Sequence, residues 1–355
     1  MGLVFVRRSP ALLLALLLVS ATTLRAQEAP SPDAPPPASN APVLQEPAGN
    51  PSETLQLNVN LVDAYFSVRD KGGFVLGLGK ADCQVYEDHK LQTIRNLTQE
   101  KNLPLTIGIL LDTSGSQQRV LPLEQQSGAR FLKEVLTPKD EAFLISFDVN
   151  VDLLSDYTNS APALTRAINQ ASINTASSSA GIPGIGGGPM PTRNPRGTLL
   201  YDAVYLAAHD KLQSQAGRKI LVLLTDGGDQ GSQETLKSAE EAAQKANTIL
   251  YVILIADHPF TDTFGTSYSG KAQMEQLARD TGGRVIDVGN NGHKLEDAFD
   301  QIQNELRTQY LLSYTPANKQ ADGKYRKLEI DCGKGLTVQA RKGYYAIVGD
   351  EDNPN

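Results

Sequence analysis

Between residues 103 and 307 the sequence alternates short apolar runs with longer amphipathic stretches. The apolar runs predict strands at 105–111, 141–147, 149–154, 219–224, 248–256 and 284–288, and the amphipathic stretches predict helices at 121–136, 161–170, 199–213, 232–246, 272–281 and 295–306. Strands separated by helices of this length run parallel, because a helical crossover returns the chain to the same end of the sheet. We therefore predict an α/β domain over residues 101–307, with a doubly wound, mostly parallel sheet.

Shorter strands without helices between them lie on both sides of this domain. Residues 54–100 alternate apolar and polar side chains, with a first turn at 70–73 and a second hairpin predicted over 85–97. Residues 308–348 contain β-type runs at 309–314, 324–331 and 336–340. Each set is too small to be stable alone, so we predict that the two sets form one discontinuous β-sandwich around the α/β domain. A separate small subdomain at the tail is the alternative.

The amino terminus resembles an export signal. Two arginines, Arg7 and Arg8, precede an apolar run at 11–19 and a small-residue cleavage motif that ends at Ala26. This run is too short to cross a bilayer, so no transmembrane segment is expected after cleavage of residues 1–26. We predict an exported protein, periplasmic or extracellular; an uncleaved amino-terminal anchor is the alternative.

Two terminal segments have compositions that cannot form a packed core. Residues 27–53 are rich in Pro, Ala, Ser and Glu and contain few large aliphatic side chains, which predicts a disordered tether. A short polar tail at 349–355 is expected to be disordered as well.

The charge and cysteine content exclude several classes of protein. The chain has 33 basic and 40 acidic residues and a net charge of -7, and loss of the three arginines in residues 1–26 gives -7 - 3 = -10. This acidity and the lack of a dense Lys/Arg run argue against a nucleic-acid-binding protein. Two cysteines allow at most one disulfide and exclude a multi-cysteine zinc or iron–sulfur site.

Oxygen-bearing side chains follow two of the predicted strands. The strand at 105–111 is followed by Asp112, Ser114 and Ser116, and the strand at 219–224 is followed by Thr225 and Asp226. In the common doubly wound order the first and fourth strands are neighbours, so the two aspartates should meet at one crevice at the carboxyl edge of the sheet.

A third hydroxyl, from Thr198, precedes the helix predicted from residue 199 and completes the candidate metal site. Two carboxylates and three hydroxyls favour a hard divalent ion such as Mg²⁺ or Mn²⁺ over zinc. The predicted metal ligands are Asp112, Ser114, Ser116, Thr198 and Asp226.

In this order and spacing, the five residues resemble a von Willebrand factor A domain with a complete metal-ion-dependent adhesion site. That pattern is Asp-x-Ser-x-Ser, a distant Thr, and a distant Asp followed by Gly, and the resemblance covers about residues 103–307. It implies that Ser114, Ser116 and Thr198 bind the ion directly, whereas Asp112 and Asp226 bind it largely through water. It also implies that a partner protein contributes an Asp or Glu to the ion.

The flanking segments resemble a narrower group, the bacterial von Willebrand factor A-related exported proteins common in acidobacteria. The similar segments are 77–82, 86–88, 310–314 and 342–345. This chain departs from the group's pattern at His89, where glycine is usual, and at Cys83, where a large aromatic residue is common.

The two cysteines lie in different halves of the predicted sandwich. Cys83 belongs to the first half and Cys332 to the second, so in an exported protein we predict a disulfide between them. Two buried free thiols are the alternative.

Catalytic motifs are lacking. Ser114 occupies the position where an aspartyl-phosphate hydrolase needs a second Asp, no Gly-x-Ser-x-Gly follows Leu111, and the four histidines show no metal-ligand spacing. We therefore predict that the chain is not an enzyme but an exported, metal-dependent protein-binding module of the adhesion type. The loops at 174–197 and 257–270 are expected to border its site. The alternatives are a structural envelope protein whose ion stabilises the fold, and an accessory subunit of a larger enzyme or assembly.

Overall fold

The computed structural model describes residues 61–100, 103–173, 197–255 and 270–347, all within one compact unit, Leu55–Asn355. The predicted signal segment, tether and tail lie outside these ranges, as do the two loops apart from their last residues, Gly197 and Gly270. No helix in the described ranges is long and apolar enough to cross a membrane.

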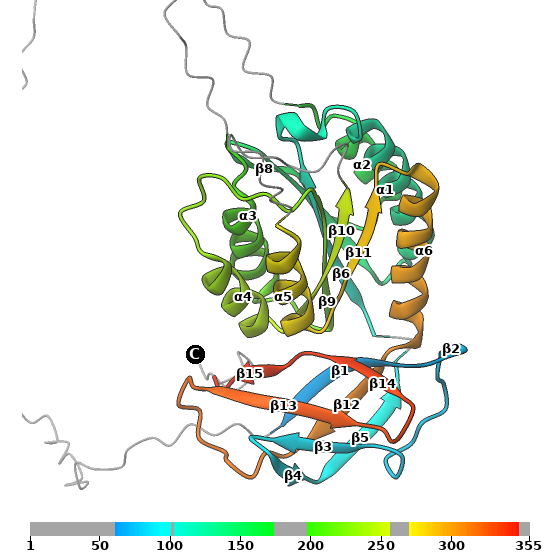
Figure 1. Ribbon diagram of the computed structural model, residues 1–355, viewed down its shortest axis with the longest axis vertical. Helices are drawn as coiled ribbons and strands as arrows, with labels where there is room; N and C mark the ends of the chain where they lie inside the picture. Colours follow the sequence, from blue (N-terminus) through cyan, green and yellow to red (C-terminus); the bar gives the residue numbers. More distant parts are fainter. Residues whose placement is uncertain (1–60, 101–102, 174–196, 256–269, 348–355) are drawn as a thin grey trace, which may run out of the picture. The chain divides into compact units, whose positions relative to one another are not determined.

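A six-stranded sheet forms the centre of the α/β part (Figure 1). Its order is β11 (Val285–Gly289), β10 (Thr248–Ile255), β9 (Arg218–Thr225), β6 (Leu105–Asp112), β7 (Glu141–Phe147) and β8 (Val151–Thr158). All neighbours are parallel except β8, which runs antiparallel to β7. Numbered from β6, the order read from β8 is 3-2-1-4-5-6, so the predicted doubly wound, mostly parallel sheet is confirmed.

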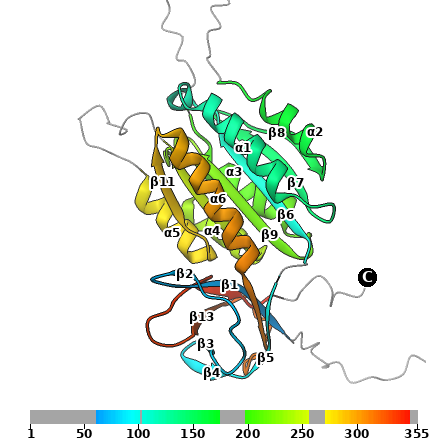
Figure 2. The ribbon, with the colours of Figure 1, turned by 90° about the vertical axis from the view of Figure 1, so that its right-hand side faces the viewer.

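Helices cover both faces of this sheet (Figures 1 and 2). One face packs against α1 (Leu121–Val135), α2 (Ala161–Ile168) and α6 (Gly292–Thr308), and the other against α3 (Leu200–Leu206), α4 (Leu236–Lys245) and α5 (Lys271–Thr281). Because neither face meets water, every residue of β6, β9 and β10 is buried. This burial explains why these strands are nearly continuous apolar runs in the sequence.

Two antiparallel sheets form the rest of the described structure. The first contains β1 (Val62–Asp70), β2 (Gly73–Phe74), β5 (Ile94–Gln99), β12 (Tyr310–Tyr314) and β14 (Thr337–Ala340), and the second contains β3 (Gln84–Glu87), β4 (Lys90–Gln92), β13 (Tyr325–Asp331) and β15 (Gly343–Tyr345). Each sheet combines strands that precede and follow the α/β part, and their inner faces share one apolar core. The predicted α/β sheet flanked by a discontinuous β-sandwich is therefore confirmed.

The hairpin predicted over residues 85–97 is shorter than expected. β3 and β4 pair around a two-residue turn in which Asp88 and His89 both have positive φ, 45° and 65°. That backbone matches the twist of a tight hairpin, and His89 adopts it although glycine does so more easily. After β4 the chain changes sheets, because β5 pairs with β12.

The helix predicted over 232–246 begins at Leu236 instead. The Asp202 carboxylate accepts hydrogen bonds from the backbone N–H groups of Gln233 and Glu234, which hold the preceding segment in a loop. Thr235 then caps the helix through the N–H of Ser238.

Glu305, near the end of α6, joins the sandwich to the α/β part. Its Oε1 accepts hydrogen bonds from Ser67 on β1 (3.1 Å), Tyr251 on β10 (3.0 Å) and Gln339 on β14 (2.8 Å). Its Oε2 accepts one from Nε of Arg284 at 2.9 Å, and the side chain is 1% exposed. One buried carboxylate thus connects four segments that are far apart in the sequence.

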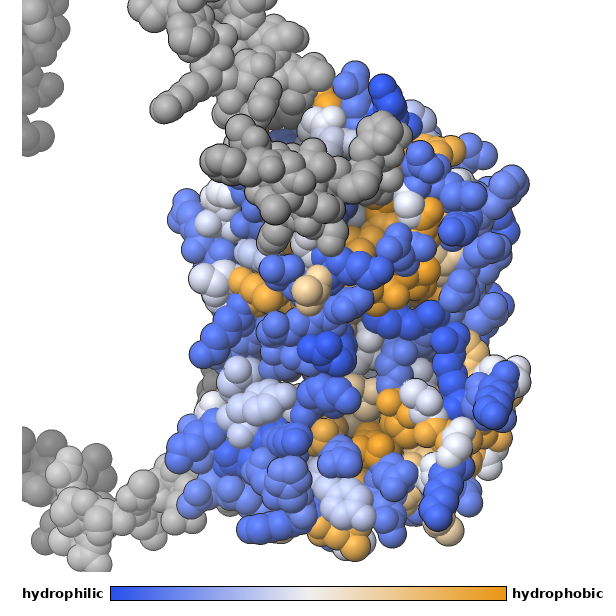
Figure 3. Space-filling model, viewed as in Figure 1, coloured by the Kyte–Doolittle hydropathy of each residue, from blue (hydrophilic) through white to orange (hydrophobic). Residues whose placement is uncertain are grey.

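The surface is predominantly hydrophilic on the face viewed in Figure 3, with smaller hydrophobic areas. The large hydrophobic side chains with substantial exposure in the described ranges are Leu61, Leu76, Leu91, Leu153, Leu206, Tyr325 and Ile347. They are distributed over several elements, as is ordinary for a folded protein.

Candidate functional site

Asp112 is the last residue of β6 and lies completely buried at the carboxyl edge of the sheet. The backbone N–H of Ser114 donates to its Oδ1 at 3.0 Å, and the hydroxyl of Thr225, at the end of β9, donates to its Oδ2 at 2.6 Å. The parallel register of β6 and β9 produces this contact, since Leu111 is paired with Leu224. The ends of the two strands therefore meet, as the doubly wound order requires.

Two predicted hydroxyl ligands lie side by side on the loop after β6. A short 3₁₀ turn, Gly115–Gln117, follows Ser114 and brings the Oγ atoms of Ser114 and Ser116 to 3.0 Å. Ser114 is buried and Ser116 is exposed, so the pair extends from the buried Asp112 toward solvent.

Asp226 follows Thr225 directly and is partly exposed. Its Oδ1 accepts a hydrogen bond from the N–H of Gly228 at 3.0 Å, which fixes the side chain in the loop. The pKa of Asp112 is raised to about 7, mainly by burial and secondly by the negative charge of Asp226. Since the charged form of Asp112 is disfavoured by its surroundings, a cation at this edge would stabilise it.

Thr198 is held at the same edge by its backbone. It exchanges two backbone hydrogen bonds of 2.9 Å with Gln230, in the loop after Asp226, and the next N–H, of Leu199, donates to the carbonyl of Asp148 at 2.8 Å. No hydrogen bond in the described structure joins its hydroxyl to the other four predicted ligands. The structure therefore brings Asp112, Ser114, Ser116 and Asp226 together and ties Thr198 to their loops.

Gly270, the residue before α5, packs directly against the loop of Asp226. A Cβ added at Gly270 would lie 1.8 Å from the carbonyl oxygen of Gly227, and the backbone has φ of +57°. Both the space and the left-handed backbone require glycine here. The start of α5 thus limits where the residue after Asp226 can lie.

Two buried polar side chains near the site were not predicted from the sequence. Glu124, in the first turn of α1, is 0% exposed, and neither carboxylate oxygen has a hydrogen-bond partner in the described structure. Gln117 is also 0% exposed; its Nε2 donates to the carbonyl of Ile255 at 3.4 Å, while its Oε1 has no partner there. The pKa of Glu124 is raised well above its usual value, mainly by burial and secondly by the negative charges of Asp112 and Asp226.

The helical pattern contained a signal for Glu124. The buried stripe of α1 includes Leu121, Gly128 and Phe131, and Glu124 occupies the position of this stripe where an apolar residue is expected. An acid at such a position indicates either a buried ion pair or a functional group.

The donor set fits a hard cation. Carboxylate and hydroxyl oxygens converge without a sulfur or imidazole group, and a buried carboxylate behind them has no partner. In the described ranges no group of three or more His, Cys, Asp or Glu side chains is arranged to hold a metal ion. The predicted site has only two carboxylates, so an ion bound there would also need the hydroxyl groups as ligands.

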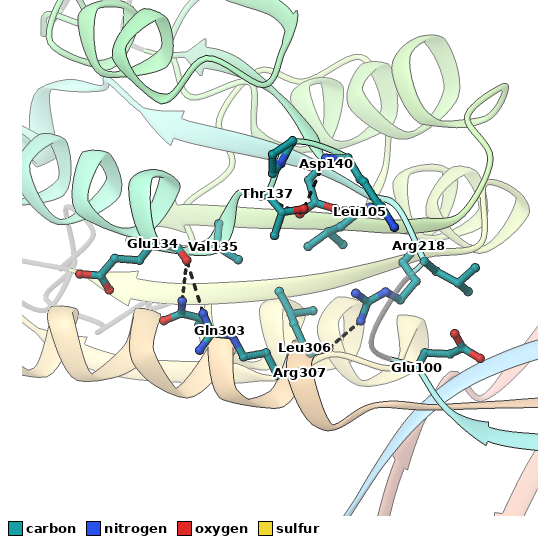
Figure 4. Close-up of a pocket in the computed structure, with 13 residues that line it drawn as sticks. Glu100, Leu105, Glu134, Val135, Thr137, Asp140, Arg218, Gln303, Leu306 and Arg307 are labelled. Carbon is teal, nitrogen blue, oxygen red and sulfur yellow. Dashed lines mark hydrogen bonds between the residues drawn. The ribbon is translucent and has the colours of Figure 1, made fainter.

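A pocket of about 640 Å³ lies away from this edge (Figure 4). It is bordered by Leu105 at the start of β6 and by Arg218 at the start of β9, so it occupies the amino-terminal edge of the sheet. Arg218 donates to the carbonyl of Leu306 at 2.6 Å, and Gln303 donates to that of Glu134 at 2.9 Å. These bonds connect the walls of the pocket, which is separate from the candidate metal site.

The two cysteines lie in the sandwich, distant in sequence from the site. Cys83 and Cys332 are both 5% exposed, their Cα atoms are 4.0 Å apart, and the structure joins their Sγ atoms in a disulfide across 249 residues of sequence. This link connects the two halves of the sandwich, which are separated by the α/β part.

The strand order defines an open α/β sheet, and the polar cluster lies at its carboxyl edge between β6 and β9, where the order of the strands reverses. No protein-family model and no curated protein matches this sequence. Solved structures do match it. BatB, a conserved hypothetical protein from Bacteroides thetaiotaomicron, is 17% identical with a TM-score of 0.43, over 57% of this chain and 100% of that one.

Two further solved structures are similar at the same level. The vWF domain of the type V pili tip protein Mfa5 from Porphyromonas gingivalis is 13% identical with a TM-score of 0.40, over 58% of this chain and 95% of that one. Proximal thread matrix protein 1 from the mussel byssus, with a zinc-occupied MIDAS motif, is 15% identical with a TM-score of 0.43, over 62% of this chain and 49% of that one. At these identities and TM-scores the matches carry no argument about ligands or activity.

Proposed function

We propose that this chain is an exported von Willebrand factor A-like module that binds a partner protein through a divalent cation, Mg²⁺ or Mn²⁺. The observation that carries the proposal is the buried carboxylate of Asp112, held at the sheet edge beside Asp226 and two adjacent serine hydroxyls. Hydroxyl ligands are neutral, so an ion bound there would retain positive charge for an additional acidic ligand.

The residues have distinct roles in this proposal. Ser114, Ser116 and Thr198 would contact the ion with their hydroxyls, and Asp112 and Asp226 would bind it largely through water. Thr225 orients Asp112 by its 2.6 Å hydrogen bond, so it supports the site without contacting the ion. An Asp or Glu of the partner, accessible from the side of exposed Ser116, would complete the coordination.

The direct test is capture of a partner from a cell-envelope extract by the wild-type protein and the Asp226→Ala variant, with Mg²⁺ and with chelator. The captured protein should be lost with chelator and with the variant alike. Capture that persists under both conditions would contradict the proposed mechanism. In that case a bound ion that increases thermal stability would indicate a structural envelope protein instead.

The variant also needs a fold control. Asp229, three residues after Asp226, accepts hydrogen bonds from the N–H of Tyr201 and the hydroxyl of Ser232 within the neighbouring loops. An Asp229→Asn variant changes the same loop by one charge and should keep metal-dependent capture.

A further inference from the structure

Glu124 occupies a position that is unusual for a carboxylate. It lies on the sheet-facing side of α1, is 0% exposed, and has no hydrogen-bond partner for either oxygen in the described structure. Burial of a carboxylate without a partner costs several kcal/mol. Something other than these protein atoms is needed to offset that cost.

Protonation does not remove the problem. A protonated carboxyl group has an O–H that needs an acceptor, and no described side chain or backbone group accepts from Glu124. The charges that act on Glu124 are both negative, from Asp112 and Asp226, so the surroundings give it no counter-ion.

The position of Glu124 relates it to the candidate metal site. The loop that contains Ser114 and Ser116 leads directly into α1, and Glu124 lies in the first turn of that helix. The three acids do not form a group arranged to hold a metal ion directly. A cation bound at the edge would nevertheless attract the charge of Glu124, since interactions between buried charges are only weakly screened.

We propose that Glu124 provides a third negative charge behind the metal site and thereby strengthens the affinity of the site for a divalent cation. This inference rests on the proposed function. The third charge would hold the ion when no partner protein is bound.

The test is calorimetric titration of Mg²⁺ into the metal-free proteins. Glu124→Gln preserves the size of the side chain and removes its charge, and should weaken Mg²⁺ binding by about 10-fold or more, because the attraction between the buried charge and the ion is lost. Glu124→Asp retains the charge and should bind within a few-fold of wild type. Glu134→Gln, on the same helix but exposed and paired with Arg130, should bind like wild type.

Urea unfolding in chelator separates this role from ordinary packing. Without metal, Glu124→Gln should have a stability within about 1 kcal/mol of wild type, because it exchanges one buried polar group without a partner for another, and Mg²⁺ should then stabilise it less. Equal Mg²⁺ affinity of Glu124→Gln and wild type would overturn the inference, and so would a loss of stability in chelator that accounts for the weaker binding. If wild type itself binds no Mg²⁺, the proposed metal site fails, and the inference fails with it.

Discussion

Replacing Glu305 by alanine should strongly destabilise the protein, because this carboxylate connects the α/β part to the sandwich. The substitution removes the acceptor for Ser67, Tyr251 and Gln339 and the ionic partner of Arg284. The side chains of Arg284 and Glu305 are 19% and 1% exposed, so water cannot replace the lost contacts well.

The expected cost is about 3–5 kcal/mol in the free energy of unfolding, the range for removing one member of a buried ion pair. Urea denaturation at pH 7, followed by circular dichroism, measures it. Glu305→Gln should lose less, since an amide oxygen can still accept from Tyr251 and Ser67 while the charge opposite Arg284 is gone.

A control on the same helix distinguishes the loss of the buried contacts of Glu305 from the loss of a negative charge in general. Glu296 pairs with Arg130 at 3.4 Å, and both side chains are substantially exposed, so Glu296→Ala should change stability by less than about 1 kcal/mol. A cost below about 1 kcal/mol for Glu305→Ala would refute the reasoning. It would mean that contacts other than those of Glu305, such as the hydrogen bond from Gln339 to the carbonyl of Gly282, hold the two parts together.

Three further predictions concern the disulfide, a buried tyrosine and the glycine beside the site. Mass mapping should find the peptides of Cys83 and Cys332 linked until reductant is added, and separate peptides without reductant would contradict the pairing. Because the disulfide closes a loop of 249 residues, its reduction should lower the free energy of unfolding by at most about 5 kcal/mol. Burial raises the pKa of Tyr65 to about 12, so on raising the pH the unfolded chain loses this proton before the folded chain does. The free energy of unfolding should therefore fall between pH 10 and 12, by up to about 3 kcal/mol. A Tyr65→Phe variant that loses as much stability over this pH range as wild type would refute this. Gly270→Ala should lower the melting temperature and weaken Mg²⁺ binding, because the methyl group of the alanine would collide with the carbonyl group of Gly227. Unchanged values in both assays would contradict this prediction.

The sequence predicted the α/β sheet because the evidence for it is local. Apolar runs such as 105–111 and 219–224 could be recognised individually, and the crossover rule then determined their direction. Asp112 and Asp226 are predicted to meet because they lie within two residues of the carboxyl ends of these strands, and the contact of Asp112 with Thr225 places the strand ends together.

Features that depend on distant contacts were harder to predict. The helix at 232–246 was placed too early because the hydrogen bonds from Gln233 and Glu234 go to Asp202, about thirty residues away. The change of sheet between β4 and β5 has no local signature, since a strand pattern does not specify its partner. The importance of Glu124 depends on burial by other elements, and its place on the apolar stripe was the available clue.

The pairing of β1 with β12 has a mechanical consequence. Val62 is opposite Tyr314 and Phe66 is opposite Tyr310, so the chain enters β1 at one end of the ladder, and α6 connects to β12 at the other. A force applied between α6 and the start of β1 would draw the two strands in opposite directions along their length. The hydrogen bonds of the ladder would then resist together in shear instead of opening one after another.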